Sequence, residues 1–232
     1  MRTLPNIFRS IFLATLFCLI AVETDAQPLS ISIKPVFGKA DMRLEETYFK
    51  LKSGDSIRVD LLRFYLSGLE LLQNGEPVWK EQNSYHLVDA ADIRSCNLAV
   101  NIPQGLRFNS IKFNLGIDSV TNVSGAMGGD LDPTRGMYWT WQSGYINFKL
   151  AGASNLCSTR KNQFQFHLGG YLSPYAALQT VTLNASGSAI TVYFDVEKLL
   201  EGINLARQNE IMSPGEESIV ISKLAAQAFR TK

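Results

Sequence analysis

Apolar and polar residues alternate along most of the chain, which predicts β-strands because successive strand side chains point to opposite faces of a sheet. The alternation is clear in eight segments: 31–34, 57–61, 69–71, 98–102, 111–117, 164–168, 181–183 and 192–196. Turn-forming sequences such as Asn74-Gly75 lie between them. Many short strands separated by turns predict an all-β fold, an antiparallel β-sandwich of about eight to ten strands.

The pattern changes near the C-terminus, where apolar residues fall at helical spacing. It predicts one or two short helices, over residues 196–208 and 214–229, the second with Ser213 as N-cap and Pro214 at its first position. No earlier segment has a helical period, which excludes a βαβ nucleotide-binding fold. The chain has no internal repeat and no low-complexity linker, so we expect residues 27–232 to form a single domain.

The N-terminus has the features of a secretory signal peptide. Arg2 and Arg9 are followed by an apolar run over residues 10–22 and by a small-residue end at Ala26. The apolar run is too short to span a bilayer. We therefore expect residues 1–26 to be removed by cleavage after Ala26, leaving a periplasmic or secreted protein that does not span the membrane.

Two cysteines, Cys96 and Cys157, remain after this cleavage. In an exported protein an even pair of cysteines is most simply a disulfide, which is our expectation here. The alternative is a thiolate metal ligand, which requires reduced sulfur in an oxidising compartment.

Composition narrows the range of functions. The chain has 232 residues, with 22 Lys and Arg against 21 Asp and Glu and a formal net charge of +1. A balanced charge without long runs of one sign argues against a protein that binds nucleic acid. The sequence has no Gly-x-Ser-x-Gly, His-Glu-x-x-His or phosphate-binding loop, so we expect no enzyme. Its only histidines are His86, for which a structural hydrogen bond is at least as good an explanation, and His167.

The most unusual stretch is GMYWTWQSGY, residues 136–145, which holds two of the three tryptophans. On a strand, Met137, Trp139 and Trp141 would share one face. Such an aromatic face is common in the core of a sandwich. It is also compatible with a soft metal site, because thioether and imidazole ligands suit Cu(I). His167 is the better imidazole for that site, since strand alternation turns it away from its apolar neighbours.

Two other interpretations stay open. Tyr138, Tyr145 and Trp79 would suit a module that holds a sugar or another apolar ligand on exposed aromatic rings. Alternatively, the protein is an envelope scaffold without a ligand, and its tryptophans belong to the core. The distinguishing feature is whether Trp139 and Trp141 are buried or line a cleft near a histidine.

Several segments, in the same order over most of the mature chain, resemble a known family. They are FYLSGL (64–69), YHLVD (85–89), LGIDS (115–119), NVSG (122–125), LDP (131–133), GMYWTWQSGY (136–145) and FHLGG (166–170). The Met-aromatic-Trp-x-Trp-x-x-Gly-Tyr element is the most specific of them. On these residues the chain resembles the MbnP-like copper-binding proteins of the bacterial periplasm.

The resemblance implies a β-sandwich that binds copper outside the cytoplasm. In the family, a tryptophan can be oxidised to kynurenine by a partner dihaem protein related to cytochrome c peroxidases, and the modified residue then joins histidines at a copper site. Trp139 and Trp141 match the tryptophan element, and His167 matches the histidine before the Gly-Gly pair. Copper-binding members also carry a histidine in the loop upstream of the Met-aromatic-Trp element. This chain has none there, at residues 122–127, so either Met127 substitutes as a soft donor or the site is incomplete.

The predicted ligand set follows from both arguments. We expect Cu(I) at His167, with Met137 or Met127 as thioether donor. Trp139 or Trp141 is expected to be the modified residue, or to contact the cation through its aromatic face.

Overall fold

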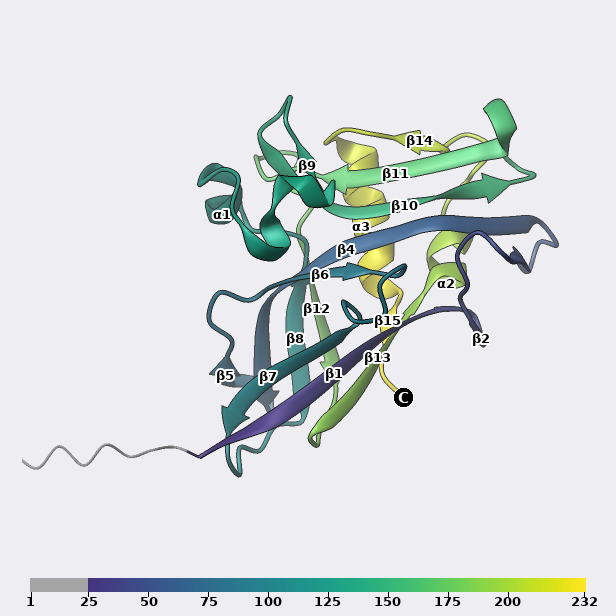
Figure 1. Ribbon diagram of the computed structural model, residues 1–232. Coiled ribbons are helices and arrows are strands. Elements are labelled where there is room, and N and C mark those ends of the chain that lie inside the picture. The colour runs from purple at the N-terminus through teal and green to yellow at the C-terminus, as the bar shows by residue number, and fades with distance from the viewer. Residues whose placement is uncertain (1–24) are drawn as a thin grey trace, which may run out of the picture.

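Two β-sheets packed against each other make up most of residues 25–232, the part of the chain that the computed structural model describes (Figure 1). The first sheet contains β15 (Phe229–Arg230), β13 (Ala189–Asp195), β1 (Ala26–Phe37), β2 (Ala40–Asp41) and β7 (Asn97–Pro103). The second runs β12 (Gln179–Asn184), β8 (Ser110–Leu115), β4 (Ser56–Gln73), β10 (Gly144–Ser154), β11 (Gln163–Gly169) and β14 (Glu210–Ile211). Paired onto it are β3 (Tyr48–Lys50), β5 (Glu76–Lys80), β6 (Tyr85–Asp89) and β9 (Tyr138–Trp139). This two-sheet, mostly β architecture confirms the predicted fold class. The predicted signal peptide lies outside the described residues, except for its last two.

Strand β4 is the central strand of the second sheet and bends in its middle. It pairs with β10 through residues 57–64 and with β8 through residues 66–72. The register with β8 shifts between Ser67 and Glu70, and Gly68 within this interval has a φ of +60°. Glycine adopts this left-handed conformation without steric cost, so the bulge at Gly68 redirects the strand from one set of neighbours to the other.

The strands differ from the predicted ones in three ways. The predicted strands 57–61 and 69–71 are parts of the single strand β4, which is 18 residues long. Strand β10 is buried on both faces along most of its length, so its sequence lacks the alternation that reveals a strand. Strands β1 and β13 run parallel, as do β11 and β14, which the predicted antiparallel sandwich did not include; the long connections between these strands permit this direction.

The helices are short: α1 (Ser119–Val123), η1 (Gly129–Leu131), η2 (Pro133–Arg135), η3 (Arg160–Asn162), α2 (Val196–Glu201) and α3 (Glu216–Gln227). The two predicted C-terminal helices are present with shifted bounds. Helix α2 ends at Gly202 and not at residue 208, since glycine is a poor helix former. Helix α3 follows Gly215, so Ser213 is not its N-cap and Pro214 precedes it; two acidic residues in its first turn favour this start.

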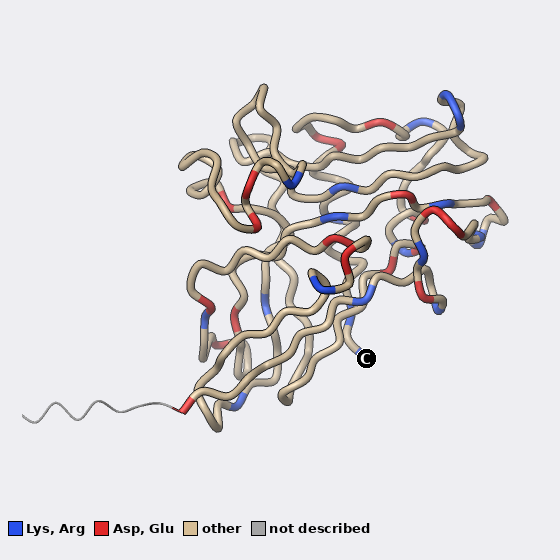
Figure 2. Tube along the Cα trace, viewed as in Figure 1, with Lys and Arg blue, Asp and Glu red and all other residues tan. Residues whose placement is uncertain are grey.

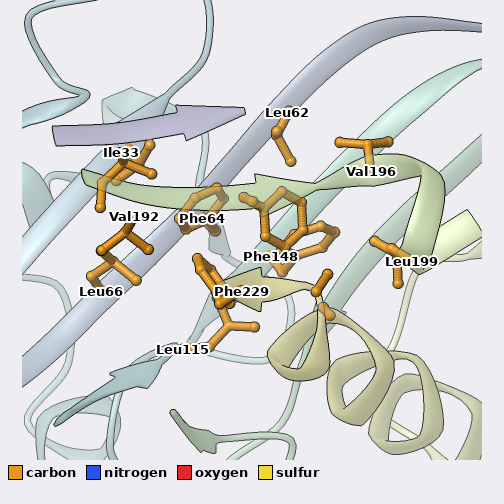
Figure 3. Packing of buried hydrophobic residues seen from close by; sticks show 14 of the residues in the cluster. Ile33, Leu62, Phe64, Leu66, Leu115, Phe148, Val192, Val196, Leu199 and Phe229 are labelled. Atoms are coloured by element: carbon orange, nitrogen blue, oxygen red, sulfur yellow. The ribbon is translucent and has the colours of Figure 1, made fainter. Parts of the chain in front are cut away.

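A large apolar cluster fills the space between the two sheets (Figure 3). The ring centroid of Phe64 lies 5.3 Å from that of Phe194, 5.6 Å from that of Phe229 and 6.0 Å from that of Phe148. Aromatic rings at these separations attract each other beyond the gain from burial. Because β13 and β15 carry two of these rings and β4 and β10 the others, the contacts join the two sheets.

The predicted disulfide is wrong. Cys96 and Cys157 are both buried and both free. The thiol of Cys96 points to the carbonyl oxygen of Asp89 at 3.6 Å, and that of Cys157 to the carbonyl oxygen of Leu205 at 3.7 Å. The two thiols serve as small apolar parts of the main cluster, a common role for buried cysteine, and each is directed to a different neighbour.

Charged residues are spread over the molecule, with Lys and Arg intermingled with Asp and Glu (Figure 2). In residues 25–232, no helix is long and apolar enough to cross a membrane.

Candidate functional site

A second, smaller apolar cluster lies on the outer face of the second sheet. Its members are Tyr65 from β4, Leu87 from β6, Tyr145 and Ile146 from β10, and Ile117, Leu131, Met137 and Trp139 from the segment between β8 and β10. Phe64 and Leu66 belong to the main core, so Tyr65 between them points to the opposite face. Residues 116–143 therefore form an additional layer over the sheet, where Figure 1 shows α1 and β9.

A buried asparagine holds this layer in place. Asn122 is 2% exposed and donates through Nδ2 to the carbonyl oxygens of Ile117 (3.0 Å) and Asp118 (2.9 Å). Its Oδ1 accepts the backbone N–H of Tyr145 at 2.7 Å. The hydroxyl of Tyr145 in turn accepts the backbone N–H of Met127 at 2.9 Å. These bonds fix α1 and the loop after it against β10.

The two candidate thioether donors lie in different surroundings. Met137 is fully buried in the outer cluster, where it packs against other apolar side chains. Met127 is 45% exposed, so its thioether is accessible from solvent. The structure therefore assigns a packing role to Met137 and leaves Met127 as the accessible sulfur of the pair.

The two candidate tryptophans also differ in exposure, and they do not share one strand face as predicted. Strand β9 ends at Trp139, and a turn follows it. Trp139 is 7% exposed and Trp141 is 66% exposed, with their ring centroids 5.8 Å apart at an angle of 50°. The indole of Trp139 lies against Gly169, because a Cβ placed there would be 2.6 Å from Cζ3 of the ring.

His167 is on the same strand as Gly169, two residues earlier, and therefore on the same outer face as the Trp139 indole. Phe166 and Leu168 are buried in the core, as the alternation predicted. Burial and the nearby charge of Lys149 lower the pKa of His167 to about 4. The imidazole is therefore neutral at pH 7, the form that binds metals.

A row of basic side chains leads to His167 across three strands. Arg63 on β4 is paired with Lys149 on β10, and Lys149 is paired with His167 on β11. Nζ of Lys149 donates to the carbonyl oxygen of Gly136, and Nη1 of Arg63 donates to that of Arg135 at 3.2 Å. The two cations thus hold the backbone directly before Met137 and Trp139. Burial lowers the pKa of Lys149, and the charge of Arg63 lowers it further.

The structure brings three of the predicted site residues to one part of the outer face: His167, Trp139 and Trp141. Met127 lies in the loop after α1, where its backbone N–H bonds to the hydroxyl of Tyr145, and its described contacts do not include His167. A neutral imidazole beside aromatic rings suits a soft monovalent ion better than a divalent one. Within residues 25–232, no three His, Cys, Asp or Glu side chains come together as a metal-binding group. Zinc and other divalent ions usually need such a group, whereas soft sulfur ligands select Cu(I).

The other histidine and the other aromatic residues lie in structural positions. Nε2 of His86 is 2.7 Å from Oε2 of Glu81, which supports the structural interpretation of this residue. Tyr145 is buried, and Trp79 on β5 packs against the main core. Trp79 and Tyr145 therefore do not join Trp141 in an exposed aromatic platform of the kind that a sugar-binding module requires.

Comparison with known proteins identifies the family. The family model described as MbnP matches residues 26–213. This chain belongs to the MbnP family. Its fold is similar to that of a solved structure, MbnP from Methylosinus trichosporium, with a TM-score of 0.61 and 15% sequence identity over 82% of this chain and 83% of that chain. At this identity the MbnP structure supports the fold alone. No curated protein sequence matches the chain.

The sequence analysis located His167 and the two tryptophans but missed Lys149 and Arg63. A signal was present, since Lys149 is the charged residue of the mostly apolar segment INFKLAGA, residues 146–153. A charged residue at an alternating position usually faces solvent, so its position next to His167 is visible only when β10 and β11 are paired.

Proposed function

We propose that this MbnP-family protein binds and handles copper outside the cytoplasm, with Cu(I) held at His167. The observation that supports this most directly is a partly buried, neutral imidazole on the same sheet face as the buried indole of Trp139, with Trp141 beside it at the surface. A neutral imidazole has a lone pair free for a metal, and Cu(I) accepts few, soft ligands. Met127 is the thioether that we propose as a further donor, because its side chain is exposed.

In this proposal each residue of the site has a separate role. His167 provides the nitrogen ligand, and Trp139 covers one side of the site and limits the access of water. The bonds of Asn122 and Tyr145 keep the loop that carries Met127 in place. Motifs for catalysis are missing, so we propose a binding protein and not an enzyme.

We further propose that a tryptophan of this site is oxidised to kynurenine by a dihaem partner of the cytochrome c peroxidase type. Two oxygen atoms add to C2 and C3 of the indole and the C2–C3 bond breaks, which leaves C2 as a formyl group on the ring nitrogen. Water then hydrolyses the bond between this nitrogen and C2, and C2 leaves as formate. Two molecules of peroxide, activated by the partner, supply the two oxygen atoms and are reduced to two molecules of water. Trp141 is the residue that a partner protein reaches first, because 66% of its surface is exposed.

A Cu(I) titration under anaerobic conditions, in competition with a chromogenic chelator, tests the copper site. We expect one tightly bound Cu(I) per chain and a loss of affinity of at least about tenfold in His167→Ala, since one ligand bond is removed. His86→Ala is the matched control and is expected to bind as the unmodified protein does. Stoichiometric binding that His167→Ala leaves unchanged would rule out this ligand assignment.

Intact-mass measurement and peptide mapping of the protein from its own source test the oxidation. We expect a modification within residues 136–145 that Trp141→Phe removes and Trp139→Phe retains. If both tryptophans are unmodified in the presence of the dihaem protein, the kynurenine proposal is wrong, while the copper titration still decides the metal site.

A further inference from the structure

Lys149 is the charged residue nearest in the sheet to the imidazole of His167. The two residues are direct cross-strand partners of β10 and β11, and their side chains lie on the same outer face. The Cβ atoms of such a pair are about 5 Å apart. An ion held by His167 therefore lies within the electrostatic reach of the Lys149 ammonium group.

Two neighbours hold the ammonium group of Lys149 close to this site. Its Nζ donates to the carbonyl oxygen of Gly136, at the end of η2. On the other side of Lys149 in the sheet stands Arg63, whose own charge blocks movement in that direction. Lys149 is also partly buried, so solvent screens its charge less than that of a fully exposed lysine.

No carboxylate in the described part of the chain, 25–232, forms an ion pair with Lys149. The nearest acidic partner in the row, Asp89, is 2.7 Å from Nε of Arg63 and is engaged there. Ala151 and Gln165, which follow and precede the pair on the same face, are uncharged. Glu210 of β14, the cross-strand partner of Gln165, is on the far side of β11 from Lys149.

We infer that Lys149 is a specificity-determining residue that excludes divalent cations from the His167 site and so makes it selective for a monovalent ion. The inference rests on the proposed copper site. Coulomb repulsion grows in proportion to the charge of the bound ion, so the repulsion energy between Lys149 and a divalent ion is twice that for a monovalent ion at the same position. The effective dielectric constant at the site lies between those of protein and water. For two charges about 5 Å apart in such a medium, one extra unit charge on the bound ion lowers its affinity by about tenfold to a hundredfold.

Affinities for Cu(I) and Zn(II), measured on the same purified protein, test the inference. Zn(II) is chosen because it is divalent and redox-inactive. In Lys149→Met and Lys149→Gln the affinity for Zn(II) relative to Cu(I) is expected to rise by about tenfold or more. Lys149→Arg keeps the charge and is expected to keep the selectivity. The amide of Lys149→Gln retains a donor for the Gly136 carbonyl, which guards against loss of the local fold.

The control is Lys34→Met, which makes the same change in net charge at an exposed position of β1 in the other sheet. It is expected to leave the ratio of the two affinities unchanged. A purely structural role of Lys149 predicts that both metals weaken together, with a constant ratio in all variants. That result overturns the inference. If His167→Ala abolishes Cu(I) binding while the Lys149 variants keep the original ratio, only the role of Lys149 is wrong. A protein that binds neither metal at His167 overturns the copper site and this inference together.

Discussion

Gly169 illustrates how a single small residue determines where an indole ring lies. Trp139 packs its six-membered ring onto the backbone of β11 at this residue, where any Cβ would overlap the ring. The contact brings the tryptophan and His167 to the same part of the sheet. The order of residues in FHLGG thus has a steric meaning: the histidine faces the outer side of the sheet, and the glycine two positions later makes room for the aromatic ring on that side.

The variant Gly169→Ala is expected to displace Trp139 and to destabilise the fold by about 1–3 kcal/mol, the usual cost of an overpacked contact. Tryptophan fluorescence should shift to longer wavelength as the ring becomes hydrated, and urea denaturation gives the change in the free energy of unfolding. Gly128→Ala is the control, since no atom lies within 4 Å of its Cβ position. Equal behaviour of the two variants contradicts the contact.

Asn122 is the second residue whose side chain carries a local structure. Replacement by Ala leaves the backbone N–H of Tyr145 buried without an acceptor, which costs about 1–3 kcal/mol. We expect Asn122→Ala to lower the free energy of unfolding by this amount. Ser124→Ala, an exposed change in the same helical turn, is expected to alter it by less than about 0.5 kcal/mol.

A buried serine joins helix α3 to strand β11. The hydroxyl of Ser218, which is 0% exposed, accepts the backbone N–H of Gly169 at 3.1 Å and donates to its carbonyl oxygen at 3.1 Å. A single side chain of the helix therefore satisfies both backbone groups of the residue that supports Trp139. One turn later, Ser222 is equally buried, but its hydroxyl has no hydrogen-bond partner.

This difference makes the two serines a matched pair for a test. Ser218→Ala is expected to destabilise the protein by about 1–3 kcal/mol and to increase hydrogen exchange in β11, because two buried backbone groups lose their partner. Ser222→Ala is expected to be neutral or stabilising, since it removes a buried polar group that has no bond to lose. Equal losses of stability in both variants contradict this assignment of the hydrogen bonds.

On the scale of the whole molecule, stability depends on one apolar core shared by two sheets and not on a covalent cross-link. The rings of Phe64, Phe194 and Phe229 connect the sheets directly, and the two cysteines are reduced parts of the same cluster. A core of this size is sufficient for a chain of this length.

The absence of a cross-link between Cys96 and Cys157 gives a simple prediction. The protein lacking residues 1–26, unfolded without reductant, should show two thiols that react with a thiol reagent. A reductant should leave its midpoint of thermal unfolding unchanged. Unreactive sulfurs, together with a lower midpoint after reduction, would show that the pair is bridged.

The alternation of apolar and polar residues predicted the fold class correctly. It shows which side chains face the core, and this depends only on neighbouring residues along one strand. It failed at β10, where both faces are covered: one by the main core and the other by residues 116–143. The alternation also failed at Trp141. It continues past Trp139, whereas strand β9 ends there and a turn follows.

The sequence by itself determined the two-sheet fold, the family and the position of His167 with its side chain away from the core. Only the tertiary structure decided that Met137 is buried, that Trp139 lies on Gly169, and that both cysteines are free. It alone placed Lys149 next to His167. Alternation and motifs depend on neighbours along one strand, whereas these contacts depend on how β10 and β11 pair and on which segment covers them. The pairing of β10 with β11 places the charge of Lys149 beside His167, and the sequence of either strand alone does not show this.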